Sequence, residues 1–559
     1  MKKGNIVDFL VNQINDAINH TVDVLNENNI DRNNIKVIVD KNENIDFGDF
    51  STNFVLSLGL PKEKCSEYAD DLARTFTNKK YFKEVKAIKP GFINFRLSNY
   101  LLHQVLFDII DQGKKFGIAK KTKLNYNIEF VSANPTGLLH IGHARNAAIG
   151  DTLARIWEAN GIHVNREYYI NNAGNQMELL ALSVLIRYQQ LFDLKVELPK
   201  DSYHGDEIIT VAKKLKEKYG NELLHVKFDD KGITSKFAKE KNVIKSFAEN
   251  YLLSIIKSTL ENFGVSFNIW FPETELYKNN MIKIALELLK DHIYSKDGAT
   301  WLKTTECGDD KDRVLVKSDG NNTYFIPDIA YHNIKLSRGY DKIFDIWGAD
   351  HTSYAERMKI AMKLLGWDKN KLEILIMQMV RLTKNGKEFK MSKRTGNSLT
   401  LEDLINAIGK ESARWYLVNK PITSHLEIDV EQVSKKDRNN PLYYVQYAHA
   451  RINHILCKAK YKLPTNFNLL TSKFERQIII VLHSYITTLR KIANSYEVNI
   501  LTVYLYNLAK LFHSYYASNK IVDSENPELS QQRYWLAYCI KTVIANGLAL
   551  LDIEPANEM

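Results

Sequence analysis

Two histidines, His140 and His143, stand between a predicted strand and a predicted helix. Both side chains can donate hydrogen bonds to phosphate oxygens, and the free backbone N–H groups at a helix start add partial positive charge. Gly142 lies between them and has no side chain, so a flat base can lie against the backbone there. Two histidines at this spacing are more often core or capping residues. The strand–turn–helix setting is what favours phosphate binding.

A second stretch, residues 389–397, reads Phe-Lys-Met-Ser-Lys-Arg-Thr-Gly-Asn. It is short and basic and is flanked by Gly386 and Gly396, which predicts a surface loop. Its ammonium groups, Lys390 and Lys393, can neutralise a triphosphate. Such a loop alone is usually only a solvated surface. Its pairing with the histidine motif, about 250 residues upstream, is what indicates function.

The elements that must position these groups follow a βαβ pattern. An apolar strand at 128–131 is cut off by the turn Asn-Pro-Thr-Gly at 134–137, and helical spacing follows from 144 to 160. A second strand is predicted at 163–170, so the unit is a parallel βαβ. Ligands of such folds bind at the carboxyl ends of the strands, where every candidate residue lies.

Further along the chain, residues 177–297 have a charged, helical pattern that predicts an insertion between two halves of the nucleotide fold. The second half then resumes with a strand at 343–347, a helix at 354–365 and a buried strand at 374–380. That last strand is expected to deliver the lysine loop. We therefore expect the catalytic domain to span residues 120–433.

The two ends of the chain are predicted to form separate domains. Residues 1–110 combine an amphipathic helix with short strands, which indicates a small α+β domain. Residues 434–559 are almost wholly helical in pattern. With 559 residues and 45% hydrophobic side chains, the chain is long enough for two to four domains.

Composition indicates the class of partner and the cellular compartment to expect. Lys and Arg number 76 against 66 for Asp and Glu, and the net charge of +10 suits a polyanionic partner without proving one. The four cysteines are far apart, so neither a zinc site nor a disulfide framework is indicated, and a reducing cytoplasm fits. No export signal and no stretch of about 20 apolar residues is present, so we expect no membrane association.

The pairing of His-Ile-Gly-His at 140–143 with Lys-Met-Ser-Lys at 390–393 resembles the class I aminoacyl-tRNA synthetases. Three other stretches narrow the resemblance to arginyl-tRNA synthetases. These are Ser-Ala-Asn-Pro-Thr-Gly at 132–137, Tyr324 with Asp-Ile-Ala-Tyr-His at 328–332, and Asn-Pro-Leu-Tyr-Tyr-Val-Gln-Tyr-Ala-His-Ala-Arg at 440–451. Trp270 with Glu273 and Thr274 is also similar to the family, whereas Asn172 and Asn268 stand where it usually has Asp.

The resemblance implies an α/β fold. It predicts a class I Rossmann-like nucleotide-binding catalytic domain, a small α+β N-terminal tRNA-binding domain and an all-helical C-terminal anticodon-binding domain. It also implies an arginine–tRNA ligase, which activates arginine with ATP to arginyl-adenylate, releases pyrophosphate and transfers arginine to the 3′-terminal ribose of its tRNA. Positioning and charge neutralisation dominate such chemistry, so no nucleophile is needed.

By the same resemblance, the catalytic residues are His140, His143, Lys390 and Lys393. The ATP-binding residues are His140, Gly142, His143, Gly348, Asp350, His351, Lys390, Met391, Ser392 and Lys393. The arginine-binding residues are Glu129, Asn134, Tyr324 and Asp328. Without the family, the last four have simpler explanations as an edge-strand charge, a turn former, a packing residue and a helix cap.

The expected ligands are tRNA(Arg), L-arginine and ATP, with Mg²⁺ accompanying ATP and no metal bound by the protein itself. We expect a monomer in the cytoplasm that forms the adenylate only when tRNA is present. Three other functions remain open at this point. They are another class I aminoacyl-tRNA synthetase, a nucleotidyltransferase with only the histidine motif, and a catalytically inactive synthetase-like tRNA-binding protein.

Overall fold

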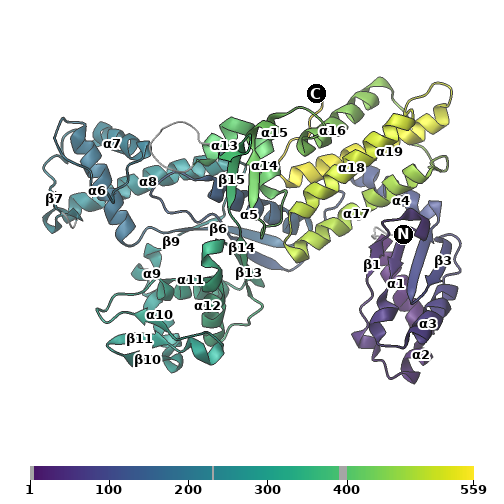
Figure 1. Cartoon of the computed structure of the whole chain (residues 1–559), viewed down its shortest axis with the longest axis horizontal. Coiled ribbons are helices and arrows are strands. Elements are labelled where there is room, and N and C mark those ends of the chain that lie inside the picture. The colour runs from purple at the N-terminus through teal and green to yellow at the C-terminus, as the bar shows by residue number, and fades with distance from the viewer. Residues whose placement is uncertain (1–5, 230–231, 389–398) are drawn as a thin grey trace. The chain divides into compact units, whose positions relative to one another are not determined.

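The computed structural model of the chain describes residues 6–229, 232–388 and 399–559. It contains two compact units, shown in Figure 1. The first comprises residues 1–119, 436–496 and 500–559, and the second comprises residues 120–435 and 497–499. The second unit carries the histidine motif, so its sheet is described first.

A five-stranded parallel sheet is the centre of the second unit. Its strand order is β14 (Leu372–Met377), β13 (Lys342–Gly348), β5 (Asn125–Glu129), β6 (His163–Ile170) and β9 (Ile269–Pro272). The chain builds the sheet outward in one direction from β5 and in the other direction from β13. Such a reversal leaves a crevice at the carboxyl ends of the two neighbouring strands, where α/β proteins bind ligands.

Helix α5 (Ile141–Ala159) connects β5 to β6 and is buried along most of its length. Gly150 allows this close packing, because a Cβ atom there would lie 2.4 Å from the ring of Phe130. The predicted strand at 163–170 and the predicted helix after the histidines are confirmed. The strand predicted at 128–131 lies instead at 125–129, since Val131 and Ser132 adopt positive φ angles of 68° and 41° and leave the sheet.

The single strand predicted at 374–380 is wrong. The structure divides it into β14, in the central sheet, and β15 (Val380–Lys384), in a second sheet with β16 (Lys387–Glu388) and β17 (Leu426–Asp429). The break falls at Gln378, whose N–H donates to the carbonyl oxygen of Ile422 rather than continuing the ladder. The lysine loop therefore follows a β15–β16 hairpin.

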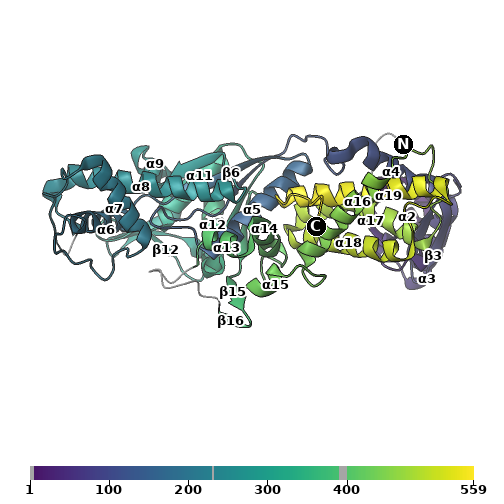
Figure 2. The same ribbon diagram turned by 90° about the horizontal axis from the view of Figure 1, so that it is seen from above.

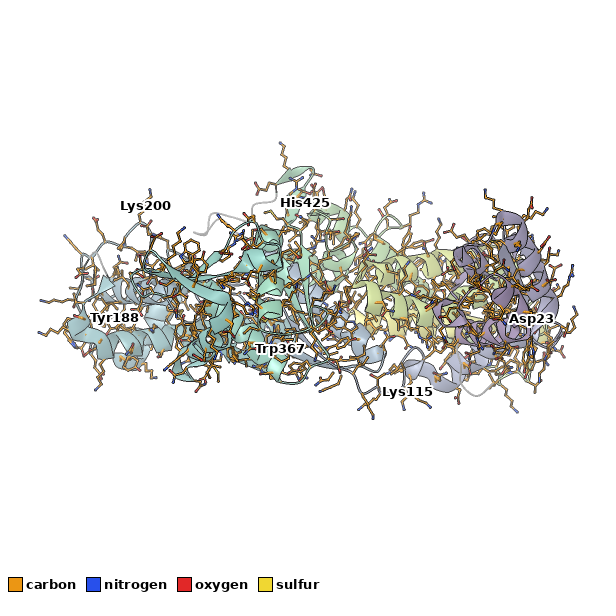
Figure 3. The ribbon with its side chains drawn as sticks, turned by 90° about the horizontal axis from the view of Figure 1, so that it is seen from below. Asp23, Lys115, Tyr188, Lys200, Trp367 and His425 are labelled. Carbon is orange, nitrogen blue, oxygen red and sulfur yellow. The ribbon has the colours of Figure 1, made fainter. Side chains whose placement is uncertain are left out.

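A helical insertion lies between β6 and β9 and contains α6 (Asn175–Gln190), α7 (Asp206–Tyr219) and α8 (Ala238–Asn262). It has a core of its own around Tyr188, which is labelled in Figure 3. The prediction of helix over 177–297 is confirmed for these segments and wrong for 269–272, which form β9 of the central sheet, and for the strands at 228–229, 232–233 and 293–296. A short hairpin, β7 (Phe228–Asp229) and β8 (Gly232–Ile233), also belongs to the insertion.

The remaining elements of the second unit flank the sheet. The helices are α9 (Thr274–Lys278), α10 (Met281–Leu288), α11 (Phe325–Ser337), α12 (Thr352–Leu364), α13 (Leu401–Ile408), α14 (Lys410–Val418) and α15 (Val430–Ser434). The strands are β10 (Ile293–Lys296), β11 (Ala299–Leu302) and β12 (Arg313–Val316), which form an antiparallel sheet. Helices α11 and α12 share a hydrophobic core with β13 and β14 and hold the second half of the site.

The first unit combines an antiparallel sheet with a helical bundle. The sheet has the order β1 (Val39–Lys41), β2 (Phe50–Thr52), β4 (Phe92–Leu97) and β3 (Phe82–Ile88), accompanied by α1 (Ile6–His20), α2 (Val22–Glu27), α3 (Lys62–Thr75) and α4 (Asn99–Gln112). The bundle comprises α16 (Pro441–Lys458), α17 (Lys473–Ser495), α18 (Asn499–Ser518) and α19 (Pro527–Leu550), which run alongside one another in Figure 2. A helix that crosses a membrane must be both long and apolar. None of the helices in the described ranges combines the length and apolar character needed to cross a bilayer.

Candidate active site

The two histidines of the turn are locked together by backbone hydrogen bonds. Nδ1 of His140 accepts hydrogen bonds from the N–H groups of Gly142, at 3.0 Å, and His143, at 3.4 Å. Nδ1 of His143 accepts one from the N–H of His140, at 3.2 Å. Because Nδ1 is an acceptor in both rings, each neutral imidazole carries its proton on Nε2. Both Nε2–H groups thus remain available as donors.

Burial lowers the pKa of His143 to about 3, and burial also lowers the pKa of His140. Both rings are therefore neutral near pH 7. Their ring centroids are only 3.7 Å apart, so the two donors are held side by side. A Cβ atom on Gly142 would lie 2.7 Å from the ring of His140, so the glycine is required for His140 to fold back over the helix start.

The segment that follows the lysine loop returns to the histidines. Leu401 N–H donates to the Leu139 carbonyl at 2.7 Å, and Ile141 N–H donates to the Leu399 carbonyl at 3.0 Å. Thr400 caps α13 and forms a β-bridge with His140. Lys390, Met391, Ser392 and Lys393 lie outside the described residues. The described chain that follows them nevertheless lies directly beside the turn that carries the two histidines.

Arg145, one turn into α5, fixes the base of the β15–β16 hairpin. Its guanidinium donates to the carbonyl oxygens of Gln378 at 2.7 Å, Ser424 at 2.9 Å and Pro421 at 2.9 Å. Arg145 is fully buried and has no carboxylate partner among the described residues, and burial lowers its pKa to about 10. The helix that carries the histidines is therefore tied to the hairpin that precedes the lysine loop.

Two carboxylates without a cationic partner face the same part of the site. Asp328, in the first turn of α11, accepts a hydrogen bond from the hydroxyl of Tyr354. Glu273 follows β9 and accepts a long hydrogen bond, 3.5 Å, from the hydroxyl of Tyr277. In the described part of the chain, neither carboxylate forms an ion pair with a lysine or an arginine.

The pKa values of these two acids are raised by burial, because no lysine or arginine in the described ranges compensates their charges. Burial raises the pKa of Asp328 to about 6. Burial and then the nearby charge of Asp328 raise the pKa of Glu273 to about 7. Two neighbouring acids whose charged forms are disfavoured in this way create a strong preference for a cationic ligand.

Tyrosine rings surround the two carboxylates. Burial and then the charge of Glu273 raise the pKa of Tyr277 to about 12, and burial with the charges of Glu273 and Asp328 raises the pKa of Tyr169. The rings of Tyr169 and Tyr331 pack with centroids 4.6 Å apart. Aromatic walls around carboxylates suit a planar guanidinium, which stacks on rings and pairs with carboxylates through two N–H groups.

Glu129, by contrast, has a cationic partner in Lys335, although burial outweighs that partner and raises the pKa of the Glu129 carboxyl. Its Oε2 accepts a hydrogen bond from Lys335 at 2.7 Å, and its Oε1 accepts one from Ser132 at 2.9 Å. Lys335 is fully buried and also bonds Asp345, whose other oxygen is 2.8 Å from Nε2 of His332. Burial raises the pKa of Asp345, but Lys335 and His332 outweigh it and bring that pKa to about 2.

Of the other predicted site residues, Asn134 follows β5, and Gly348, Asp350 and His351 lie at the end of β13 or just after it. Asn134 donates to Gln176 at 2.5 Å, and Gly348 is the last residue of β13. Asp350 and His351 pair at 3.3 Å and are both exposed. Tyr324 precedes α11 with 85% of its surface exposed, so its ring stands in solvent rather than in the tyrosine cluster.

Glu273 is the main residue of this site that the sequence does not predict to bind a ligand. The sequence indicates it only as part of a resemblance, because the pattern of residues 177–297 predicts helix. The missing signal is the four-residue strand β9, since Glu273 directly follows it. With that strand predicted, the rule that ligands lie at carboxyl ends would have included Glu273.

Asn172, where Asp is expected from the resemblance, is explained by its two partners. Its Nδ2 donates to Glu249 Oε1 at 2.7 Å, and its Oδ1 accepts from the Thr274 N–H at 3.1 Å. An aspartate would keep the second bond but would face Glu249 with a like charge. Asn268 has a backbone role, since it exchanges two hydrogen bonds with Arg166 at the sheet edge.

We therefore expect Asn172→Asp to lower the free energy of unfolding by about 1 to 3 kcal/mol, the usual cost of a buried group left without its partner. Adding Glu249→Gln should recover most of the loss, because an amide can donate to the new carboxylate. Thermal melts of the single and double variants measure both effects. Equal losses in the two variants would contradict this explanation of the asparagine.

Three family models match the chain. The class I tRNA synthetase (R) catalytic domain matches residues 105–453, the arginyl tRNA synthetase N-terminal domain matches 8–97, and the DALR anticodon-binding domain matches 445–559. An arginine–tRNA ligase of Ureaplasma parvum is 46% identical over 95% of this chain and 96% of its own. One from Malacoplasma penetrans is 45% identical over 99% of both chains.

Among solved structures, the Thermus thermophilus arginyl-tRNA synthetase has a similar fold. Its TM-score is 0.76 at 17% identity, with 99% of this chain and 100% of that chain covered. The predicted arrangement of an α/β class I catalytic domain with an N-terminal domain and a C-terminal helical domain is thereby confirmed.

Proposed function

Because this chain belongs to the arginyl-tRNA synthetase family, it is an arginine–tRNA ligase, and we propose which of its residues carry out the two steps of that reaction. Nothing in the comparisons supports the rival functions considered from the sequence. The observation that carries the assignment of residues is the pair of carboxylates, Asp328 and Glu273, which are enclosed by tyrosines and form no ion pair with a lysine or an arginine among the described residues.

In this proposal Asp328 and Glu273 bind the guanidinium of arginine, which supplies the positive charge that the pocket lacks. Tyr169 and Tyr277 form walls beside it. Glu129 and Asn134, at the carboxyl end of β5, are proposed contacts of the same ligand, with Glu129 oriented by Lys335 and Ser132. Tyr324 is proposed to close over arginine from the exposed position at the start of α11.

ATP is proposed to bind at the turn and at the carboxyl end of β13. The Nε2–H groups of His140 and His143 donate to phosphate oxygens, and Lys390, Met391, Ser392 and Lys393 are proposed to bind the triphosphate as well. Gly348, Asp350 and His351 bound the adenosine, and Gly142 lies beneath it. Mg²⁺ enters with ATP on its phosphate oxygens, as this ion usually does.

The first step joins the carboxylate of arginine to the α-phosphorus and releases pyrophosphate, and the second transfers the arginyl group to the terminal ribose of tRNA. Fixed donors stabilise the charge that builds on the phosphate oxygens, which is where most of the rate comes from. Residues 1–110 and 434–559 are proposed to hold the tRNA, and a catalytic domain at 120–433, which carries the helical insertion between β6 and β9, is proposed to perform the chemistry. We also propose a monomer that works in the cytoplasm, which suits its four free cysteines.

Arginine binding should depend on pH through the two raised carboxylate pKa values. Below pH 6 both Asp328 and Glu273 hold protons, and above pH 7 both are ionised. We expect the Kd for arginine to rise by about tenfold per pH unit for each acid that must lose its proton on binding, and therefore by up to about a hundredfold per unit well below pH 6. Calorimetry at pH 6.5 in two buffers of different ionisation enthalpy should show release of protons on binding.

The same acids have the opposite effect on the empty protein. Their folded-state pKa values exceed the unfolded values, so ionisation costs stability. Without arginine, the stability should fall as pH rises from about 4 to 7. Saturating arginine should reduce that fall. A pH-independent Kd over this range would contradict the proposed pocket.

The function itself is tested by offering each amino acid separately with ATP, tRNA and the purified chain. Only arginine should be attached to tRNA. Pyrophosphate exchange should require tRNA, as the family resemblance implies. Attachment of a different amino acid, or of none by a folded chain, would overturn the assignment.

A further inference from the structure

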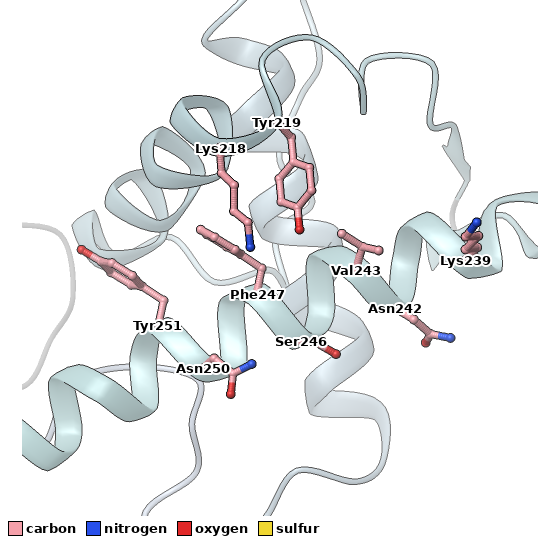
Figure 4. Close-up of a pocket in the computed structure, with 9 residues that line it drawn as sticks. All are labelled: Lys218, Tyr219, Lys239, Asn242, Val243, Ser246, Phe247, Asn250 and Tyr251. Carbon is pink, nitrogen blue, oxygen red and sulfur yellow. The ribbon is translucent and has the colours of Figure 1, made fainter.

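A groove of about 710 Å³ lies on the helical insertion, between the end of α7 and one face of α8. Figure 4 shows that Lys218 and Tyr219 come from α7, and that Phe247 and Tyr251 come from α8. None of these residues takes part in the site described above. The groove belongs to a part of the chain that has a hydrophobic core of its own.

One face of α8 presents two of the aromatic side chains of the groove, Phe247 and Tyr251. Lys239, Val243, Phe247 and Tyr251 are spaced four residues apart, so they form one stripe along the helix. The rings of Phe247 and Tyr251 are nearly parallel, at 9°, with centroids 6.5 Å apart. Both rings are only partly buried against the core of the insertion, so their faces are partly accessible.

The charged side chains that line the groove are both positive. The ammonium of Lys218 lies 5.2 Å from the ring centroid of Tyr219 and 5.5 Å from that of Phe247. Within the described ranges, neither Lys218 nor Lys239 forms an ion pair, and no carboxylate lines the groove. Three polar side chains, Asn242, Ser246 and Asn250, complete it.

These side chains match a nucleotide better than a peptide. Aromatic faces stack on bases of any sequence, lysines pair with phosphates, and amide and hydroxyl groups bond to bases and ribose. A protein segment would need aliphatic surface for its side chains, and Val243 is the one aliphatic residue among the described residues that line the groove. An anionic ligand with a flat ring can stack on the aromatic faces and pair with both lysines at the same time.

We propose that this groove binds an unstacked nucleotide of the tRNA. The base stacks on Phe247 and Tyr251. The phosphate pairs with the ammonium of Lys218, which then leaves its position near the rings of Tyr219 and Phe247. This inference rests on the proposed function, because that function makes tRNA a substrate. It adds a contact on the insertion, separate from the arginine and ATP sites.

The test is equilibrium binding of tRNA to the full-length chain at several salt concentrations. Phe247→Leu and Tyr251→Leu remove an aromatic face but keep an apolar side chain for the core. Each should weaken tRNA binding roughly 5- to 100-fold, the effect of losing one base stack. Arginine and ATP requirements in pyrophosphate exchange, measured at saturating tRNA, should not change.

Lysine substitutions test the phosphate contact. Lys218→Met should reduce the slope of log Kd against log salt by about 0.7 to 0.9. Lys213→Met, which removes the same charge from an exposed position on α7, is the matched control and should leave the slope unchanged. Melting temperatures show whether each variant is folded.

Unaltered tRNA affinity in both leucine variants, or equal slopes for the two methionine variants, would overturn the proposal. Weakened binding of ATP instead of tRNA would overturn it as well. Attachment of arginine to tRNA by the unaltered chain is scored separately, so the groove can fail while the proposed function stands.

Discussion

Replacing Asp328 with asparagine is expected to raise the KM for arginine by roughly 30-fold to several-thousand-fold at pH 8, because it removes one of two uncompensated charges in the pocket at a cost of about 2 to 5 kcal/mol. The KM for ATP should change little. Steady-state attachment of arginine to tRNA, with each substrate varied in turn, measures both quantities.

The matched control is Asp350→Asn, which removes a carboxylate from the proposed ATP side. It should affect the KM for ATP and spare that for arginine. A loss of folding can be distinguished from a loss of arginine binding. Ionisation of Asp328 lowers the stability of the empty protein, and the amide oxygen of the substituted side chain would still accept a hydrogen bond from the Tyr354 hydroxyl. The melting temperature of Asp328→Asn without arginine should therefore equal or exceed that of the unaltered chain. A parallel rise in both Michaelis constants would mean that Asp328 is only a structural residue.

Substitution of His143 is expected to slow the formation of arginyl-adenylate most. In His143→Asn, the side-chain oxygen can take the place of Nδ1 and accept from the His140 N–H, while the Nε2–H donor is lost. Removing one donor that stabilises a transition state costs about two to three orders of magnitude in rate. Single-turnover measurement with saturating arginine, ATP and tRNA isolates this step.

His143→Gln is the complementary variant. Its amide reaches the position of Nε2 but does not cap the His140 N–H, so it should keep more activity and lose more stability than His143→Asn. The helix cap is worth about 1 kcal/mol. If His143→Asn reacted at the rate of the unaltered chain, His143 would be a capping residue and would have no part in the chemistry.

The fold is predictable where the pattern is local and long. Residues 163–170 and the helix after the histidines have clear strand and helix periodicity, and the structure places β6 and α5 there. The strand β9 escapes prediction because Ile269–Pro272 is only four residues long within a charged, helical region. Short edge strands of this kind are determined by the neighbouring strand and not by their own sequence.

The parts of the site that could not be predicted depend on distant residues. Lys335 reaches Glu129 across 206 positions of sequence, and Arg145 reaches the Gln378 carbonyl across 233. Nothing in the local pattern of α11 or α5 distinguishes these buried cations from exposed ones. The motifs themselves identify the histidines and Asp328, whereas the balance of charge that leaves Asp328 and Glu273 uncompensated exists only in the folded chain.

In the proposed pocket, the two uncompensated carboxylates recognise the charge of arginine. The most direct test is the ratio of kcat/KM for arginine to that for citrulline, its neutral isostere, in attachment to tRNA. A buried carboxylate left without its cationic partner costs several kcal/mol, so the unaltered chain should prefer arginine by at least about three orders of magnitude. Asp328→Asn should reduce that preference by at least about tenfold, since part of the charge recognition is lost with the carboxylate. A small ratio in the unaltered chain, or the same ratio in the unaltered chain and in Asp328→Asn, would show that these carboxylates do not recognise the charge of arginine.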